Sequence, residues 1–152
     1  MSAEPLPVLT IDSLAHDGRG VARAGGKAVF VAGALPGERV TVRPLRRHPR
    51  RYDEAVVVEV LHPAAGRVAP RCPHFGTCGG CALQHLDETR QLELKRGHVE
   101  EQLQRIGQVA PGRWLPPLAG AAWAYRRRAR LGVKWVAKKG RVLVGFRERA
   151  TP

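Results

Sequence analysis

Short runs of β-branched residues, separated by glycine and proline turns, fill residues 7–62. The runs are VLTI (8–11), AVFVAG (28–33), RVTVRPL (39–45) and EAVVVEVL (54–61), and the turn pairs are Asp17-Gly18, Gly25-Gly26 and Pro36-Gly37. No helical period appears in this segment. Four or five strands this short predict a small closed β-barrel, because closure removes the exposed edge strands.

The charge of the chain is strongly basic and unevenly placed. Its 152 residues carry 26 Lys and Arg against 13 Asp and Glu, a formal net charge of +13. Residues 109–152 hold 11 of the basic residues and 1 acidic residue, net +10. This balance favours a polyanionic partner such as nucleic acid, and general basicity is the alternative. With no apolar run of membrane length and no signal peptide, we expect a cytoplasmic protein without a membrane partner.

A basic stretch, Arg46-Arg47-His48-Pro49-Arg50-Arg51, separates two of the expected strands. We interpret it as a loop whose candidate RNA-binding residues are Arg46, Arg47, Arg50 and Arg51, through contacts to backbone phosphates. A loop that is merely solvated is an equal alternative.

A linker, the cysteines and one helix are expected in residues 63–107. Asp87 and Glu88 favour the N-terminal end of the helix, and Gly107 favours its end. The apolar residues Leu92, Val99, Leu103 and Ile106 form one stripe. We interpret this stripe as core packing rather than as a surface for a partner.

The basic final segment, 108–152, begins with an irregular stretch at 109–123. It then predicts two strands, YRRRARLGVKWV (125–136) and RVLVGFRER (141–149), joined in a hairpin by residues 137–140. On the first strand Arg126, Arg128 and Arg130 share one face. With Lys134 and the nearby aromatic residues, they are candidate RNA contacts. The alternative is that the aromatic residues pack inward and the arginines are solvated.

All three cysteines, Cys72, Cys78 and Cys81, lie within ten residues with the spacing C-x5-C-x2-C. Thiols this close in a cytosolic chain favour metal ligation over a structural disulfide. The glycines between Cys78 and Cys81 allow backbone N–H groups to turn toward sulfur, which tunes an iron–sulfur cluster. A zinc site with His74 or His85 as fourth ligand, and no metal at all, remain open. A [4Fe–4S] cluster needs a further ligand, either a thiolate beyond Pro152 or a non-cysteine group.

The motif CPHFGTCGGCALQHL (72–86), followed by Gln91 and Lys95, resembles the iron–sulfur signature of bacterial RNA uracil-C5-methyltransferases, in particular those of 23S ribosomal RNA. IDSLAHDGRGVAR (11–23) and ALPGERV (34–40) are similar to the OB-like TRAM domain of that family, and YRRRARLGV and VGFRER resemble the start of its central domain. The resemblance implies a mainly β fold with α+β character. Its parts are a TRAM barrel (7–62), a cluster segment with a helix (63–107) and the beginning of a β-rich RNA-binding domain (108–152).

The resemblance further implies that this chain is the N-terminal, RNA-binding and iron–sulfur part of an S-adenosylmethionine-dependent enzyme that forms 5-methyluridine in 23S rRNA. Cys72, Cys78 and Cys81 are then three ligands of a structural [4Fe–4S] cluster. The catalytic cysteine, the general base and the S-adenosylmethionine site lie C-terminal in the family. We therefore expect no catalytic residue in this chain, no methyl transfer by it alone, and a monomer bound to ribosomal RNA.

Two other functions remain open from the residues. One is a stand-alone RNA-binding module that holds zinc or iron–sulfur and has no catalytic activity. The other is a redox role, in which a cluster transfers electrons or senses oxidants.

Overall fold

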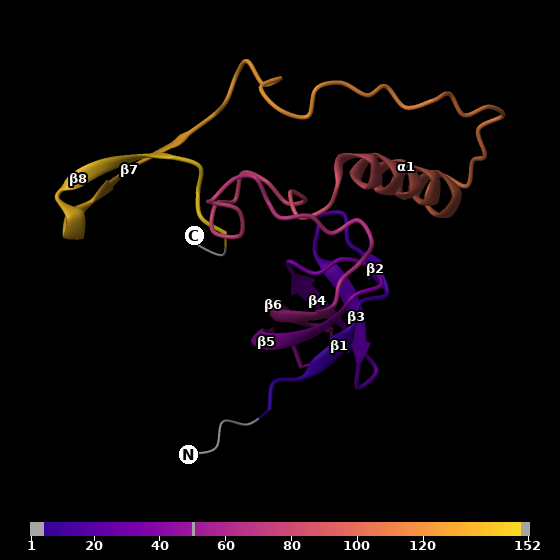
Figure 1. Ribbon diagram of the computed structural model, residues 1–152, viewed down its shortest axis with the longest axis horizontal. Helices are drawn as coiled ribbons and strands as arrows, with labels where there is room; N and C mark the ends of the chain where they lie inside the picture. The colour runs from indigo at the N-terminus through magenta and orange to yellow at the C-terminus, as the bar shows by residue number, and fades with distance from the viewer. Residues whose placement is uncertain (1–4, 50, 150–152) are drawn as a thin grey trace. The chain divides into compact units, whose positions relative to one another are not determined.

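The computed structural model describes residues 5–49 and 51–149. It divides the chain into two units, Met1–Ala69 and Pro70–Pro152 (Figure 1). The fold is mainly β with one α-helix, as expected. The division into three segments at 62 and 107 stays a prediction.

The first unit is one six-stranded sheet. Its strands are β1 (Val8–Thr10), β2 (Ser13–Leu14), β3 (Gly20–Ala24), β4 (Lys27–Ala32), β5 (Arg39–Arg47) and β6 (Tyr52–His62). Their order across the sheet is β1-β5-β6-β4-β3-β2, with β4 and β6 parallel and every other pair antiparallel. The predicted turns at Asp17-Gly18, Gly25-Gly26 and Pro36-Gly37 are confirmed, and the sequence analysis missed β2 and β3.

The prediction of a closed barrel is wrong, because no ladder joins the two edge strands among the described residues. The sheet is instead strongly curled, since β1 and β2 lie at opposite edges and only Ile11 and Asp12 separate them along the chain. The N–H of Ile11 donates to the carbonyl of Glu38 (2.9 Å), and that of Asp12 donates to the carbonyl of Val21 (2.8 Å). The chain itself therefore spans the gap that a ladder would close.

The core lies inside the curl and consists of small and β-branched residues. The inward side chains of alternate strand positions supply it, together with two residues from loops: Ile11, Ala22, Val29, Val31, Ala34, Val40, Val42 and Ala55. Gly20 allows the tight curvature, because a Cβ there would lie 2.8 Å from Cγ2 of Ile11 and 2.9 Å from Cβ of Ala34. A side chain at this position would push the edges apart.

The second unit contains little regular structure. It has the helix α1 (Glu88–Arg105) and a hairpin of β7 (Gly132–Val136) and β8 (Arg141–Gly145), linked by the short 3-10 helix η1 (Ala137–Lys139). Residues 106–131 between helix and hairpin form neither helix nor strand. None of the described helices is long and apolar enough to cross a membrane.

Helix α1 begins and ends where the sequence indicates. Oδ1 of Asp87 accepts a hydrogen bond from the N–H of Arg90 (2.9 Å), a regular N-cap, and Gly107 follows the C-cap residue Ile106. The expectation that its apolar stripe packs in a core is wrong for the described residues. The helix has no buried residue, and Val99 and Ile106 are 50% and 75% exposed.

The strand predicted at 125–136 is only half present. Residues 125–131 are irregular, so the shared strand face of Arg126, Arg128 and Arg130 is not formed. The hairpin itself is confirmed, and Gly140 ends its turn in the left-handed conformation (φ 59°). Strand pairing starts at Gly132 because β8 ends at Gly145 and offers no partner to the residues before Gly132.

A buried ion pair fixes the point where the chain leaves the sheet. The Glu38 side chain is fully buried, and its carboxylate accepts hydrogen bonds from Nε (2.5 Å) and Nη2 (2.7 Å) of Arg67. It also accepts from the N–H groups of Leu35 (2.9 Å) and Ala64 (3.2 Å). Burial alone raises the pKa of the Glu38 carboxyl. The hydrogen bonds from Arg67, Leu35 and Ala64 outweigh burial and hold the pKa below its ordinary value of 4.5.

We predict that Glu38→Gln lowers the free energy of unfolding by about 3 kcal/mol near neutral pH, because it leaves the Arg67 charge unpaired. The folded pKa of Glu38 is depressed, so its contribution is complete above the unfolded pKa and is lost as the pH falls through the folded pKa. The free energy of unfolding, measured by urea unfolding followed by circular dichroism over this pH range, should depend less on pH in Glu38→Gln than in the natural chain. The exposed Glu59, changed to Gln, is the control and should leave the profile unchanged; equal effects of the two changes would contradict the assignment.

Candidate metal and nucleic-acid sites

The three cysteines share one tight loop in the second unit. The N–H of Phe75 donates to the carbonyl of Cys72 (3.1 Å), and that of Cys78 donates to the carbonyl of His74 (2.8 Å). At the start of the loop, the N–H of Cys72 donates to Oε1 of Gln84 (3.2 Å). These turns leave Cys72 and Cys78 half-buried and Cys81 exposed, all as free thiols.

One predicted feature of a cluster loop is present. The N–H of Gly80 donates to Sγ of Cys78 at 3.3 Å, so a backbone donor already faces sulfur. Such a hydrogen bond stabilises a thiolate or a sulfur bound to metal. The loop therefore supplies a backbone N–H donor of the type that stabilises a thiolate-ligated metal centre.

The loop is not a finished metal site. Within the described residues, no three or more Cys, His, Asp or Glu side chains come together in a group able to hold a metal ion. The described residues therefore contain no preformed Cys3His group that could hold zinc. The ring of the buried His85 lies 5.2 Å from the ring of Phe75. A cluster or ion would have to gather the thiols as it binds, which is common for metal sites.

The segment after β8 docks on this loop, and the sequence analysis missed it. The N–H of Gly79 donates to the carbonyl of Arg147 (2.8 Å), and the N–H of Arg149 donates to the carbonyl of Thr77 (2.8 Å). The Arg149 guanidinium donates to the carbonyl of Cys81 and lies 5.7 Å from the centre of the Phe75 ring. About 70 residues separate the partners, so no local pattern reveals the contact.

The candidate RNA-binding residues fall into two groups, one in each unit. Arg46 and Arg47 are not in a loop but at the end of β5, where they are exposed and opposite Glu54 and Asp53 of β6. Arg51 is exposed directly before β6, and Arg50 lies outside the described residues. The prediction of a loop at Arg46 is therefore wrong, because β5 continues to Arg47, beyond the run RVTVRPL (39–45) from which the strand was predicted. The contacts themselves stay a prediction.

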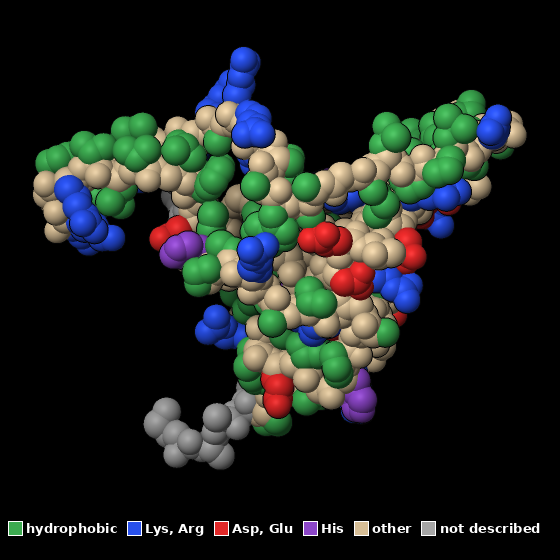
Figure 2. All heavy atoms as spheres, turned by 45° about the horizontal axis from the view of Figure 1, so that its top comes forward, with side chains coloured by type: hydrophobic (Ala, Val, Ile, Leu, Met, Phe, Trp, Pro, Cys, Tyr) green, Lys and Arg blue, Asp and Glu red, His purple; other side chains and the backbone are tan. Residues whose placement is uncertain are grey.

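The second group lies in the exposed part of the second unit. Arg126, Arg128 and Arg130 are exposed in the irregular segment, and Lys134 is exposed on β7. Aromatic side chains are exposed beside them rather than packed inward: Trp123 is 42%, Tyr125 62% and Trp135 60% exposed. Figure 2 shows hydrophobic side chains at the surface together with clusters of Lys and Arg. These rings are therefore not packed inward in the described part of the chain, and the RNA contacts stay a prediction.

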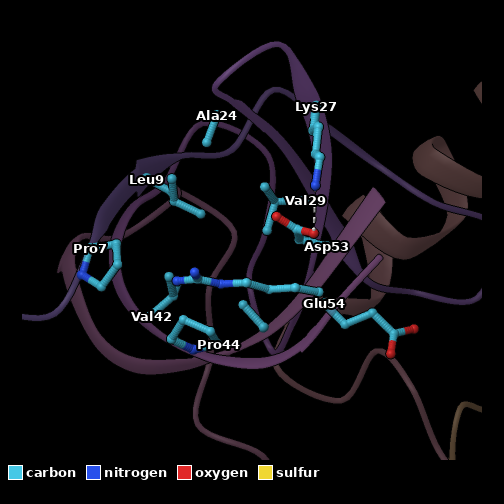
Figure 3. Close-up of a pocket in the computed structure, with 11 residues that line it drawn as sticks. Pro7, Leu9, Ala24, Lys27, Val29, Val42, Pro44, Asp53 and Glu54 are labelled. Carbon is cyan, nitrogen blue, oxygen red and sulfur yellow. Dashed lines mark hydrogen bonds and ion pairs between the residues drawn. The ribbon is translucent and has the colours of Figure 1, made fainter. Parts of the chain in front are cut away.

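The first unit also contains a cavity of about 270 Å³ inside the curl of its sheet. Leu9, Val29 and Val42 line its apolar wall, and the ion pair between Nζ of Lys27 and Oδ1 of Asp53 (3.3 Å) lies at its side (Figure 3). Described residues of β1, β3, β4, β5 and β6 line the cavity, and none of β2 does.

We predict that Gly79→Ala separates the segment after β8 from the cysteine loop, because a Cβ at Gly79 would lie 2.8 Å from the carbonyl oxygen of Arg147. Overpacking of this kind costs about 1–3 kcal/mol. Hydrogen exchange at the N–H groups of Gly79 and Arg149 should become faster. Gly112→Ala, where nothing lies within 4 Å of the added Cβ, is the matched control. Unchanged exchange in Gly79→Ala would show that the docking is not held by this contact.

Known proteins resemble this chain in one domain and, among longer relatives, over nearly its whole length. The family model of the TRAM domain matches residues 8–44, which span β1 to most of β5. The chain is 55% identical, over 99% of its length and 34% of the relative, to the 23S rRNA (uracil(1939)-C(5))-methyltransferase RlmD of Nitrosococcus oceani. It is 56% identical to the RlmD of Bordetella pertussis, over 93% of the chain and 30% of the relative. The RlmD of Xylella fastidiosa is 58% identical, over 91% of the chain and 32% of the relative.

The chain thus spans about a third of the length of the curated relatives that it matches. Residues 8–44 match the TRAM domain family, and almost the whole chain is similar to about a third of the length of 23S rRNA (uracil(1939)-C(5))-methyltransferases named RlmD.

Proposed function

We propose that this chain is the RNA-binding and iron–sulfur part of an S-adenosylmethionine-dependent methyltransferase that forms 5-methyluridine in 23S rRNA. The observation that carries the proposal is the 55% identity over 99% of the chain to an enzyme named for that reaction. The TRAM match, the exposed arginines of both units and the exposed aromatic residues of the second unit support it. We further propose that it acts in the cytoplasm as a monomer on the rRNA.

The chemistry of the proposed enzyme is covalent. A thiolate adds to C6 of a flipped uridine, C5 then takes the methyl group from the sulfonium of S-adenosylmethionine, a base removes the C5 proton and the thiolate leaves. We assign these steps to residues C-terminal to this chain and expect no methyl transfer by the 152 residues alone. The part of these residues is to bind and orient the RNA.

Cys72, Cys78 and Cys81 are the proposed cysteine ligands of a [4Fe–4S] cluster, and the fourth ligand is proposed to come from the chain after Pro152. The docked segment supports this, because the Arg149 backbone and side chain contact the loop at Thr77 and Cys81. Arg149 thus contacts backbone carbonyls of the segment that contains Cys78 and Cys81. A bound cluster would add Fe–S bonds that tie this loop together, a structural role.

Anaerobic purification of the chain should give a brown protein with iron and acid-labile sulfide. Cys78→Ser should lose most of both, because it removes the thiolate that already accepts a backbone hydrogen bond. Thr77→Ser, a neighbouring loop change that removes no thiol, is the control and should retain them. A colourless protein with stoichiometric zinc would contradict the iron–sulfur assignment and favour the zinc alternative.

The triple change of Arg126, Arg128 and Arg130 to Ala should weaken binding of a 23S rRNA fragment by several kcal/mol, at about 1–3 kcal/mol for each good contact. It should also lower the slope of log K against log salt, because fewer phosphates are neutralised. Fluorescence anisotropy over a salt series measures both.

The matched control removes Arg90, Arg96 and Arg105 of α1, which carry the same total charge but are already paired with Glu93, Glu100 and Glu101. This control should change binding little. Equal losses in the two triple variants would mean that overall charge, rather than the 126–130 segment, determines the affinity.

A further inference from the structure

A row of planar side chains crosses the outer face of the first unit. The guanidinium of Arg19 lies 4.7 Å from the centre of the Phe30 ring, and the Phe30 and Tyr52 ring centres are 5.3 Å apart with their planes at 90°. The His48 ring follows at 4.4 Å from the Tyr52 ring, tilted by 39°. We call Arg19, Phe30, Tyr52 and His48 the planar row; all four are half-buried.

Strand alternation places both rings outside the core. On β4 the side chains of Val29 and Val31 are buried in the curl, so Phe30 between them points to the outer face. On β6 the buried residue is Ala55, and Tyr52 lies on the opposite face. Because β4 and β6 are neighbours in the sheet, the two rings meet there.

A packing role does not account for this position. Phe30 and Tyr52 are the only aromatic residues in positions 1–69, and the core of the unit contains neither. Aromatic side chains gain most from full burial, yet the core is filled by Val, Ile and Ala while both rings stay half-exposed. Rings that are held outside and in contact with one another are typical of a stacking surface.

Cations lie on both sides of the planar row. In the sheet order, β3 and β5 flank β4 and β6. Arg23 is exposed on β3, and Arg43 and Arg46 are exposed on β5; none of the three forms an ion pair within residues 5–49 and 51–149. Arg19 of the row is different, because Asp17 (2.7 Å) and Glu54 (2.9 Å) pair with it and hold its plane against Phe30. The free cations are therefore at the borders of the row, where a backbone would pass.

We propose that this face binds single-stranded RNA, with unstacked bases on the planar row and phosphates on Arg23, Arg43 and Arg46. The proposal rests on the proposed RNA-binding function and names the face, the residues and the strandedness of the ligand. Planar rings and guanidinium groups stack bases without regard to sequence, and the flanking arginines neutralise the backbone. A duplex hides the faces of its bases, so it lacks the groups that this row binds.

The test uses the 152-residue chain and a short single-stranded RNA of mixed sequence that carries one 2-aminopurine. Binding should quench the 2-aminopurine fluorescence through stacking, and a duplex of the same sequence should bind more weakly. Tyr52→Leu and Phe30→Leu keep the apolar bulk but remove the ring. Each should weaken binding about 5-fold to 150-fold and abolish the quenching. Leu61→Ala, an exposed apolar position further along β6, is the control and should do neither.

Photo-crosslinking of the natural chain to RNA containing 5-bromouridine gives a result that does not depend on the folding of a variant. We expect crosslinks at Phe30 or Tyr52. RNA binding with crosslinks only in residues 113–149, or with full quenching in both Leu variants, would overturn this inference and leave the proposed function intact. A chain that binds neither single-stranded nor duplex RNA would contradict the proposed function as well.

Discussion

The fold of the first unit depends on one constraint: its two edge strands are consecutive in the chain and only two residues apart. A flat six-stranded sheet would hold β1 and β2 far from each other, so Ile11 and Asp12 force the sheet to curl. The curl creates an inside for a core of small and β-branched residues, and it turns the remaining side chains outward. Gly20 at the closing point and the buried Glu38–Arg67 pair at the exit of the chain both serve this geometry. The planar row lies on the outer face that this curl creates.

Much of this unit could be predicted from local pattern. Alternating valines and glycine turns predicted β1, β4, β5 and β6, because half-buried strands have a period of two. The strand β3, with the sequence GVARA, carries too few β-branched residues to be recognised. The closed barrel was predicted wrongly, because the alternation of apolar residues shows which side chains share a face of the sheet. It does not show whether the two edge strands pair. A loop was predicted at Arg46 and Arg47, because composition does not distinguish polar residues at the end of a long strand from a loop.

In the second unit, the sequence predicted the helix cap and the hairpin turn, which depend on neighbouring residues. It did not predict the contact between residues that are far apart in the chain. Asp87 caps α1 as expected, and the hairpin turn at Ala137–Gly140 is where the sequence indicates. The extended strand at 125–131 was wrong, because a strand needs a partner and β8 ends opposite Gly132. The docking of Arg147 and Arg149 on the cysteine loop joins residues about 70 positions apart, so no local pattern predicts it. The spacing of the cysteines predicted metal ligation, yet the thiols are not gathered in the described chain.

We propose that this chain binds ribosomal RNA, because its relatives are named for a reaction on 23S rRNA. The most direct test compares binding of the 152-residue chain to a 23S rRNA fragment around the uridine that the relatives modify and to a transfer RNA of equal length, over a range of salt. The account predicts tighter binding to the rRNA fragment at every salt concentration, with a steep loss of affinity as salt rises. Equal affinity for the two RNAs, or an affinity that does not change with salt, would contradict it.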